Sequence, residues 1–177
     1  DLLFAHASVE SGGLRAALDL PAGLELDLFD GRAWVGVVPF RMSGVRLRHT
    51  PALPWLSAFP ELNVRTYVIA DDRPGVWFFS LDVNKTLPVW AANTFFHLPY
   101  YKAEVSVHRD NDAVHYHHQR DHLSFDAVYA PAGDPFHPAQ GSFEDWSTTR
   151  YCLYAQSKRG VCYRGHIHHA PWPLQPA

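Results

Sequence analysis

The sequence predicts a mainly β protein with two or three short helices, built as an antiparallel barrel or a strongly bent sheet. Stretches of strand length, rich in β-branched and aromatic residues, follow one another along most of the chain. Aromatic residues make up 14% of the 177 residues, and the 14 prolines favour strands and fixed turns over long helices. No repeat or linker divides the sequence, so we expect one domain over residues 1–177.

The expected strands are apolar or alternating runs that are separated by turn residues. Asp30-Gly31 and the segment DDRPG are the clearest turns, and each predicts a hairpin. The three prolines of residues 50–60 predict an ordered but irregular connection. In chain order, strands are expected at residues 24–29, 32–42, 44–50, 61–70, 75–83, 102–108, 113–119, 123–130, 150–156 and 160–169.

Short helices are expected at three places between these strands. Residues 14–20 have helical spacing and are followed closely by a proline and a glycine, which end the helix. Residues 86–98 begin with a threonine that can cap a helix and a proline that suits the first turn. The sequence SFED at residues 142–145 matches a capping box, in which the serine and aspartate exchange hydrogen bonds with each other's backbone.

Composition and charge argue against several classes of partner. The formal charge of −3 and the pI near 6.5 leave no excess of positive charge to neutralise phosphates, so we expect no nucleic acid and no membrane surface as partner. No apolar run approaches the ~20 residues that span a bilayer. Cys152 and Cys162 flank a turn-like segment, and two buried free thiols in a cytoplasmic protein are favoured over a cross-strand disulfide.

The stretch ELNVRTYV carries the most informative polar pattern. Strand alternation places Glu61, Asn63, Arg65 and Tyr67 on one face. Glu61 and Arg65 would lie roughly 13 Å apart along the strand, too far to pair with each other. Each therefore needs another partner. Either the row lines an enclosed polar pocket, or it belongs to an edge strand and faces water.

The neighbouring strand favours the pocket. Both faces of residues 75–83 are largely apolar, which indicates a sheet covered on both sides. A buried unpaired charge costs several kcal/mol, so an enclosed polar row is either paired internally or built to receive a ligand. In the second case Arg65 would hold a carboxylate through charge-assisted bonds, and Glu61 would supply a proton or an acceptor.

The chain resembles a known family in segments that run through nearly its whole length: LPAGLELDLFDGRAWVGVVPFRM, FPELNVRTYV, PGVWFFSLD, FHLPYY and the C-terminal RYCLYA with IHHAPWPL. This is the YqjF-like family of uncharacterised bacterial proteins, a distant branch of the acetoacetate decarboxylase-like superfamily. The resemblance implies a bent antiparallel sheet that forms a cone or partial barrel around a small-molecule pocket. It also implies that Glu61 is similar to the acidic residue that lines the decarboxylase cavity.

The same resemblance implies that the imine chemistry of the decarboxylases is missing. Tyr100 and Tyr101 stand where the Schiff-base lysine and its neighbouring lysine would be, and tyrosine cannot form an imine. Lys102 is the only plausible replacement. Adjacent strand residues face opposite ways, so Lys102 shares a face with Tyr100 and not with Tyr101. Whether the protein is an enzyme is left open.

Twelve histidines raise the question of a metal site. His115 with His117, and His166 with His168, each put two imidazoles on one strand face, and four such nitrogens suit zinc. Nothing in the sequence brings the two pairs together, and solvated histidines are the favoured interpretation. We therefore expect no metal and no cofactor.

Other motifs with a defined chemistry are scarce. No nucleophile elbow, phosphate-binding loop or dinucleotide fingerprint is present. Arg41, Arg120 and Arg150 could each anchor a carboxylate, although surface ion pairs are the simpler interpretation. Asp82 and Glu104 are possible partners for the arginine of the polar row.

The sequence thus favours a small-molecule-binding protein whose polar pocket holds a small, carboxylate-bearing metabolite. The alternatives are a lyase-type enzyme that acts on a keto acid through Lys102 or acid–base chemistry, and a non-catalytic structural or interaction module. Glu61 is the candidate acid or base in either binding hypothesis. A homo-oligomer is possible. The candidate ligand-binding residues are Asn63, Arg65, Tyr67, Tyr100, Tyr101 and Arg41.

Overall fold

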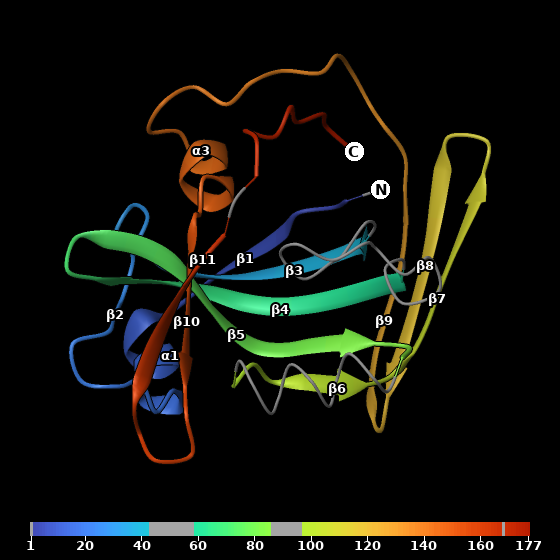
Figure 1. The fold of residues 1–177 in the computed structure, drawn as a ribbon. Coiled ribbons are helices and arrows are strands. Elements are labelled where there is room, and N and C mark those ends of the chain that lie inside the picture. The colour runs from blue at the N-terminus through green and yellow to red at the C-terminus, as the bar shows by residue number, and fades with distance from the viewer. Residues whose placement is uncertain (1, 43–58, 86–96, 168) are drawn as a thin grey trace, which may run out of the picture. The chain divides into compact units, whose positions relative to one another are not determined.

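The computed structural model describes residues 2–42, 59–85, 97–167 and 169–177 (Figure 1). Among these residues it contains eleven strands and two helices, so the predicted mainly β class is confirmed. Three predicted segments fall wholly or mostly outside the described residues. They are the strand at 44–50, the proline-rich connection at 50–60 and the helix at 86–98.

The described elements follow the predicted order with three differences. A first strand was not predicted, the second is much shorter than expected, and the strand expected at residues 102–108 is divided in two. The elements are β1 (Ala5–Val9), α1 (Ser11–Ala17), β2 (Glu25–Leu26), β3 (Ala33–Met42), β4 (Phe59–Ala70), β5 (Arg73–Val83), β6 (Tyr100–Lys102), β7 (Glu104–Asp110), β8 (Ala113–Arg120), β9 (Leu123–Tyr129), α3 (Phe143–Thr148), β10 (Cys152–Gln156) and β11 (Cys162–His166).

The strands form two sheets. The larger one has the strand order β1-β3-β4-β5-β10-β11, with β2 paired to β4 and β6 paired to β5. The smaller one has the order β7-β8-β9, and its strands lie side by side in Figure 1. Both β6 and β10 run parallel to β5, with Leu81 opposite Tyr100 and Leu153 opposite Val76. The larger sheet is therefore mixed, whereas hairpin signals in the sequence predicted antiparallel neighbours.

The chain divides into two compact units. The first consists of Asp1–Ala5, Val37–Val64 and Ser80–Ala130, and the second of His6–Gly36, Arg65–Phe79 and Pro131–Ala177. Because β3, β4 and β5 each contribute residues to both units, the division follows contacts and not the order of elements. The single domain over residues 1–177 stays a prediction.

The first unit contains the three-stranded sheet, which has one buried and one exposed face. Along β8, Val114, Tyr116 and His118 are buried while His115 and His117 are exposed. This is the period of two that a half-covered strand shows. Tyr116 packs with three other buried side chains into the local core, which consists of Leu62, Ala103, Val105 and Tyr116.

The second unit contains a small apolar core and an aromatic cluster. Leu24, Val68, Cys152 and Tyr154 form the core. The aromatic cluster joins α3 to β3 and β4, and ring centroids lie 4.3 to 5.7 Å apart in the contacts among Phe29, Trp34, Tyr67, Phe143 and Trp146. Such pairs stabilise by about 0.5–1.5 kcal/mol each beyond their buried area.

A side chain caps the first turn of each described helix, Glu10 at α1 and Ser142 at α3. Glu10 accepts hydrogen bonds from the Gly12 and Gly13 amides, so α1 begins three residues earlier than predicted. The predicted capping box at α3 is present in part. The Ser142 hydroxyl accepts from the Asp145 amide, but the Asp145 carboxylate accepts from the amide of Gly141 instead of that of Ser142.

The two cysteines are both free, as the sequence favoured. They belong to the antiparallel hairpin of β10 and β11, where Cys152 lies opposite His166 and Cys162 opposite Gln156. The thiols therefore sit at opposite ends of the strand pair. Cys152 is buried as predicted, whereas Cys162 is exposed, so the predicted burial is wrong for the second thiol.

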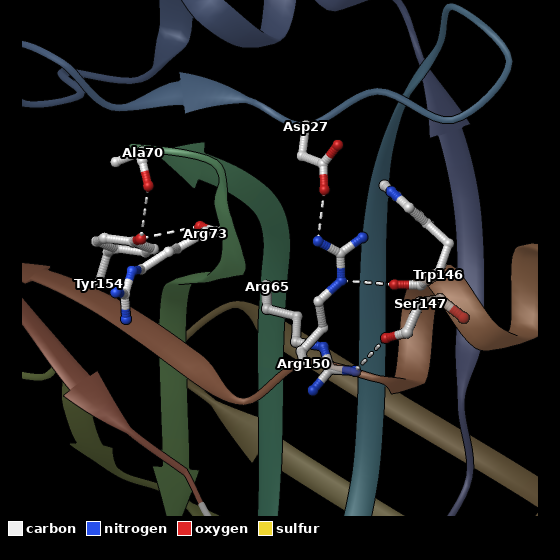
Figure 2. Close-up of polar contacts among 8 residues, drawn as sticks. All are labelled: Asp27, Arg65, Ala70, Arg73, Trp146, Ser147, Arg150 and Tyr154. Atoms are coloured by element: carbon white, nitrogen blue, oxygen red, sulfur yellow. Dashed lines mark hydrogen bonds and ion pairs between the residues drawn. The ribbon is translucent and has the colours of Figure 1, made fainter. Parts of the chain in front are cut away.

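Gly75 permits the close approach of β10 to β5. A Cβ atom on Gly75 would lie 2.7 Å from Cε2 of Tyr154 and 2.8 Å from the carbonyl oxygen of Cys152. The Tyr154 ring is held there because its hydroxyl donates to the carbonyl of Arg73, at 2.9 Å, and lies 3.4 Å from that of Ala70 (Figure 2). The glycine is thus required by packing, not by turn geometry.

We expect Gly75→Ala to lower the free energy of unfolding by about 1–3 kcal/mol, because neither the backbone of Cys152 nor the anchored tyrosine ring can move away. Gly165→Ala is the matched control. Its added carbon would meet only the side chain of Leu153, at 3.0 Å, which can change rotamer. Urea unfolding of both variants tests this, and equal losses would contradict it.

Candidate functional site

Glu61 is a buried carboxyl group on β4 in the first unit, 2% exposed. The Tyr100 hydroxyl donates a hydrogen bond to its Oε2 atom at 3.2 Å. Burial raises the pKa of Glu61 from 4.5 to about 7; the bond from Tyr100 opposes this and the nearby charge of Asp82 adds to it. Near neutral pH this carboxyl group is therefore present in both protonation states.

Tyr100 lies beside Glu61 because β6 runs parallel to β5 and places Tyr100 opposite Leu81. Burial and the neighbouring charge of Glu61 raise the pKa of Tyr100 well above its ordinary range. The phenol is therefore a hydrogen-bond donor throughout the physiological range. Tyr101, the next residue, is 42% exposed and packs its ring against the Arg120 guanidinium at 4.2 Å.

Asp82 on β5 is the only carboxylate of this region that contacts basic side chains among the described residues. Its Oδ2 atom accepts from Nε2 of His118 at 2.7 Å and from Nε of Arg120 at 2.9 Å. All three side chains belong to the first unit and are buried or half-buried. Among the described residues, no such ion pair reaches Glu61, so this group avoids a buried charge by holding its proton.

Several buried polar atoms near this network have no hydrogen-bond partner among the described residues. Buried polar groups in folded proteins are paired in the great majority of cases, so a concentration of exceptions indicates bound water or a ligand. In the first unit these atoms are Oδ1 of Asn63, Oδ1 of Asp82, Nδ1 of His118 and the hydroxyls of Tyr116 and Tyr129.

The remaining half of the predicted polar row, Arg65 and Tyr67, lies in the second unit. Figure 2 shows Arg65 with its partner Ser147. Arg65 is half-buried and donates to the carbonyl of Ser147 at 3.3 Å. Tyr67 is fully buried, and its hydroxyl lies 2.6 Å from Nε2 of His6. Burial and the charge of Arg65 lower the pKa of His6 to about 4, so this imidazole is neutral and can accept a hydrogen bond from the tyrosine hydroxyl.

Arg150 is a buried residue that the sequence suggested only as a possible surface pair or anchor. It is 4% exposed, and its Nη1 atom pairs with Oδ2 of Asp27 at 2.5 Å. Its Nε atom donates to the carbonyl of Trp146 (Figure 2). The guanidinium also lies over the rings of Tyr67 and Trp146, 5.0 and 4.5 Å from their centroids. Its described contacts therefore join α3 to the rest of the second unit.

Several other sequence predictions need correction. Asp82, suggested as a partner for the arginine of the polar row, pairs with His118 and Arg120 instead. The segment around these two residues looked like a wet surface, but His118 is 3% exposed. The missed signal is alternation: every second residue of β8 from Val114 onward is buried or half-buried.

Lys102 and Arg41 are both exposed, at the ends of β6 and β3. An imine-forming amine needs to be neutral at working pH, which a sheltered environment favours. The position of Lys102 therefore weighs against its use as a nucleophile. That it shares a strand side with Tyr100 stays a prediction from alternation, and it lies at the last position of β6.

The histidines do not form a metal centre among the described residues. No group of three or more His, Cys, Asp or Glu side chains there is arranged to hold a metal ion. His117 lies 2.6 Å from Asp126 on the exposed face of the small sheet, and His168 lies outside the described residues. Among the helices described, none is long and apolar enough to cross a membrane.

Comparison with known proteins confirms the resemblance seen in the sequence. Residues 1–177 match the family DUF2071, described as an uncharacterized conserved protein. The chain is 43% identical over 180 residues to the uncharacterized protein YqjF of Bacillus subtilis (strain 168), covering 100% of this chain and 73% of that protein.

Solved structures share the fold at much lower identity. Acetoacetate decarboxylase from Legionella pneumophila matches with a TM-score of 0.64 at 11% identity, over 93% of this chain and 63% of that one. The enduracididine biosynthesis enzyme MppR, complexed with pyruvate, matches with a TM-score of 0.61 at 14% identity, over 87% and 61% of the two chains. This chain thus spans less than two thirds of either enzyme, and the likeness establishes an acetoacetate decarboxylase-like fold.

The raised pKa of Glu61 predicts a stability that falls with pH. The folded protein binds this proton more tightly than the unfolded chain, so the stabilisation is complete below about pH 4.5 and is lost as the pH rises through about 7. The shift corresponds to about 3 kcal/mol.

Glu61→Gln keeps the shape of the side chain and removes its titration. We expect the free energy of unfolding to fall between pH 4.5 and pH 8 in the wild type, and to fall by about 3 kcal/mol less in this variant. Denaturant unfolding at the two pH values measures the difference. Glu104→Gln, on the exposed side of β7, is the control and should follow the wild type. Parallel pH profiles of wild type and Glu61→Gln would contradict the assignment.

Proposed function

We propose that this chain, which belongs to the DUF2071 family of uncharacterized conserved proteins, binds a small carbonyl or carboxylate compound beside Glu61. The observation that carries the proposal is a buried Glu61 without a cationic partner among the described residues, next to polar atoms that have no partner there either. A carboxyl group in that state donates a hydrogen bond when protonated and accepts one when ionised. It suits a ligand oxygen that gains or loses negative charge.

The neighbouring groups suit the same ligand class. The phenol of Tyr100 stays protonated and is held against Glu61, while the hydroxyl of Tyr116 adds a second uncharged group close enough for the charge of Glu61 to raise its pKa. Uncharged donors stabilise a carbonyl oxygen without requiring the burial of a further ion. The structural neighbour solved with pyruvate makes a 2-oxo acid the first compound to try.

The roles of the other candidate residues are part of the proposal. Asn63 is buried and lies two residues after Glu61 on β4. Its Oδ1 atom accepts no hydrogen bond from the described residues. It would accept a hydrogen bond from the ligand. Arg65, Tyr67, Tyr101 and Arg41 stay predicted ligand-binding residues. The cytoplasmic location and the homo-oligomer likewise stay predictions.

A thermal-shift panel of pyruvate, acetoacetate and other small carboxylates tests the binding proposal. A compound present at ten times its Kd adds about 1.4 kcal/mol of stability, which is roughly 3–6 °C in Tm for a chain of this length. The effect should weaken above about pH 7, because ionised Glu61 then repels a carboxylate.

The matched comparison is again Glu61→Gln with Glu104→Gln as control. We expect the first variant to lose at least tenfold in affinity at pH 6 and the second to bind like the wild type. If no compound stabilises the wild type more than Glu61→Gln, the proposed site is wrong.

Imine formation is the competing mechanism, and it makes a different prediction. Because Lys102 is exposed, we expect no stable adduct when borohydride is added with pyruvate or acetoacetate. Intact and peptide mass spectrometry detects a reduced adduct directly, and Lys102→Arg is the control. A reduced adduct at Lys102 that appears in the wild type and not in the variant would contradict the acid–base mechanism and support a Schiff base.

A further inference from the structure

The contacts of His118 fix which of its ring nitrogens carries the hydrogen. Its Nε2 atom lies 2.7 Å from Oδ2 of Asp82, and Arg120 donates to the same oxygen. An ionised carboxylate only accepts hydrogen bonds, so neutral His118 must hold its hydrogen on Nε2. Its Nδ1 atom is then an acceptor with a free lone pair.

That acceptor points to a missing partner. His118 is 3% exposed, and Nδ1 has no hydrogen-bond partner among the described residues. Leaving Nδ1 buried and unpaired costs about 1–3 kcal/mol, which a ligand that donates to it would recover. The arrangement is that of a base held in one tautomer by a carboxylate.

Glu61 and His118 belong to one polar network in the first unit. Asp82, which holds His118, is close enough to Glu61 for its charge to act on that carboxyl group. Tyr116 lies two residues before His118 on the same buried face of β8, and the charge of Glu61 acts on its phenol. Asp82 and Tyr116, the two neighbours of His118, thus both interact electrostatically with Glu61.

We propose that His118, oriented by Asp82 and Arg120, is the base that removes a proton from the carbon next to the carbonyl group of the ligand bound beside Glu61. The inference rests on the proposed function and adds a reaction class to it, enolisation. Nδ1 of His118 takes the proton, the electron pair of the C–H bond forms a C=C bond, and the carbonyl oxygen takes the proton of the Glu61 carboxyl group. The products are an enol, an imidazolium and a carboxylate, and the reverse step returns a proton to carbon.

Arg120 and Asp82 act through His118 and are positioning residues. Arg120 is itself held by the ring of Tyr101, 4.2 Å from its guanidinium carbon. The exposed Tyr101 therefore has a role in holding Arg120 that does not depend on contact with the ligand. Asp82→Asn removes the charge that favours the Nε2 tautomer and should slow the proton transfer without removing the base.

Proton exchange of pyruvate in D₂O tests the proposal directly. The methyl signal in the ¹H NMR spectrum disappears as deuterium replaces hydrogen, and we expect the wild type to accelerate this above the buffer rate. His118→Gln is the informative variant, because its amide nitrogen can still donate to Asp82 while no base remains. We expect it to lose at least a hundredfold in rate, within the usual range for a general base, while its pyruvate-induced shift in Tm stays within about 1 °C of that of the wild type.

The outcomes separate the two proposals. Pyruvate binding to the wild type without any exchange overturns the role of His118 and leaves the binding function standing. Exchange that persists in His118→Gln also overturns it. If no compound of the panel binds beside Glu61 and none exchanges its protons faster than in buffer, both proposals are overturned. Should His118→Gln not fold, Asp82→Asn decides, and an unchanged exchange rate there would overturn the assignment.

Discussion

The Asp82 carboxylate accepts hydrogen bonds from His118 and Arg120 through one oxygen, and this shared contact determines the charge state of its surroundings. Two carboxyl groups interact in the first unit, but among the described residues only Asp82 pairs with the Arg120 cation. Glu61 is left with a tyrosine hydroxyl and with the repulsion of its neighbour, so it retains a proton up to about pH 7. Because Arg120 pairs with one carboxyl group and not with the other, two similar side chains become an ion and an acid.

This division explains why the polar row on β4 is not uniform. Its first members, Glu61 and Asn63, lie in the first unit, where Arg120 pairs with Asp82. Its later members, Arg65 and Tyr67, lie in the second unit among aromatic rings and the buried Arg150. One strand therefore carries two electrostatic environments. Both environments avoid buried charge. His6, beside Tyr67, does so by releasing its proton, and Glu61, beside Tyr100, does so by keeping its proton.

The predictions from sequence succeeded where local pattern decides the outcome. Alternation identified β4, β5, β8 and the burial of Glu61 correctly, and the serine of SFED caps α3 as expected. They failed where the answer depends on partners distant in the chain. Asp82 and His118 are 36 residues apart and meet only through tertiary packing, which no local spacing reveals.

The parallel placement of β6 was also beyond sequence reasoning, because a parallel pair leaves no turn signal between its strands. That placement is nonetheless what brings Tyr100 to Glu61. By resemblance, Tyr100 stands where the decarboxylases would have a lysine. A lysine ammonium at this position would ionise Glu61, whereas a phenol leaves burial dominant and keeps its proton bound.

With a phenol and not an ammonium at position 100, burial dominates over ion pairing and Glu61 keeps its proton up to about pH 7. Under the proposed function, an acid poised near neutral pH suits proton transfer, and a tyrosine at position 100 cannot form an imine. The proposed proton transfer also needs a base, and the buried imidazole of His118, which is hydrogen-bonded to Asp82, is the group we assign to it.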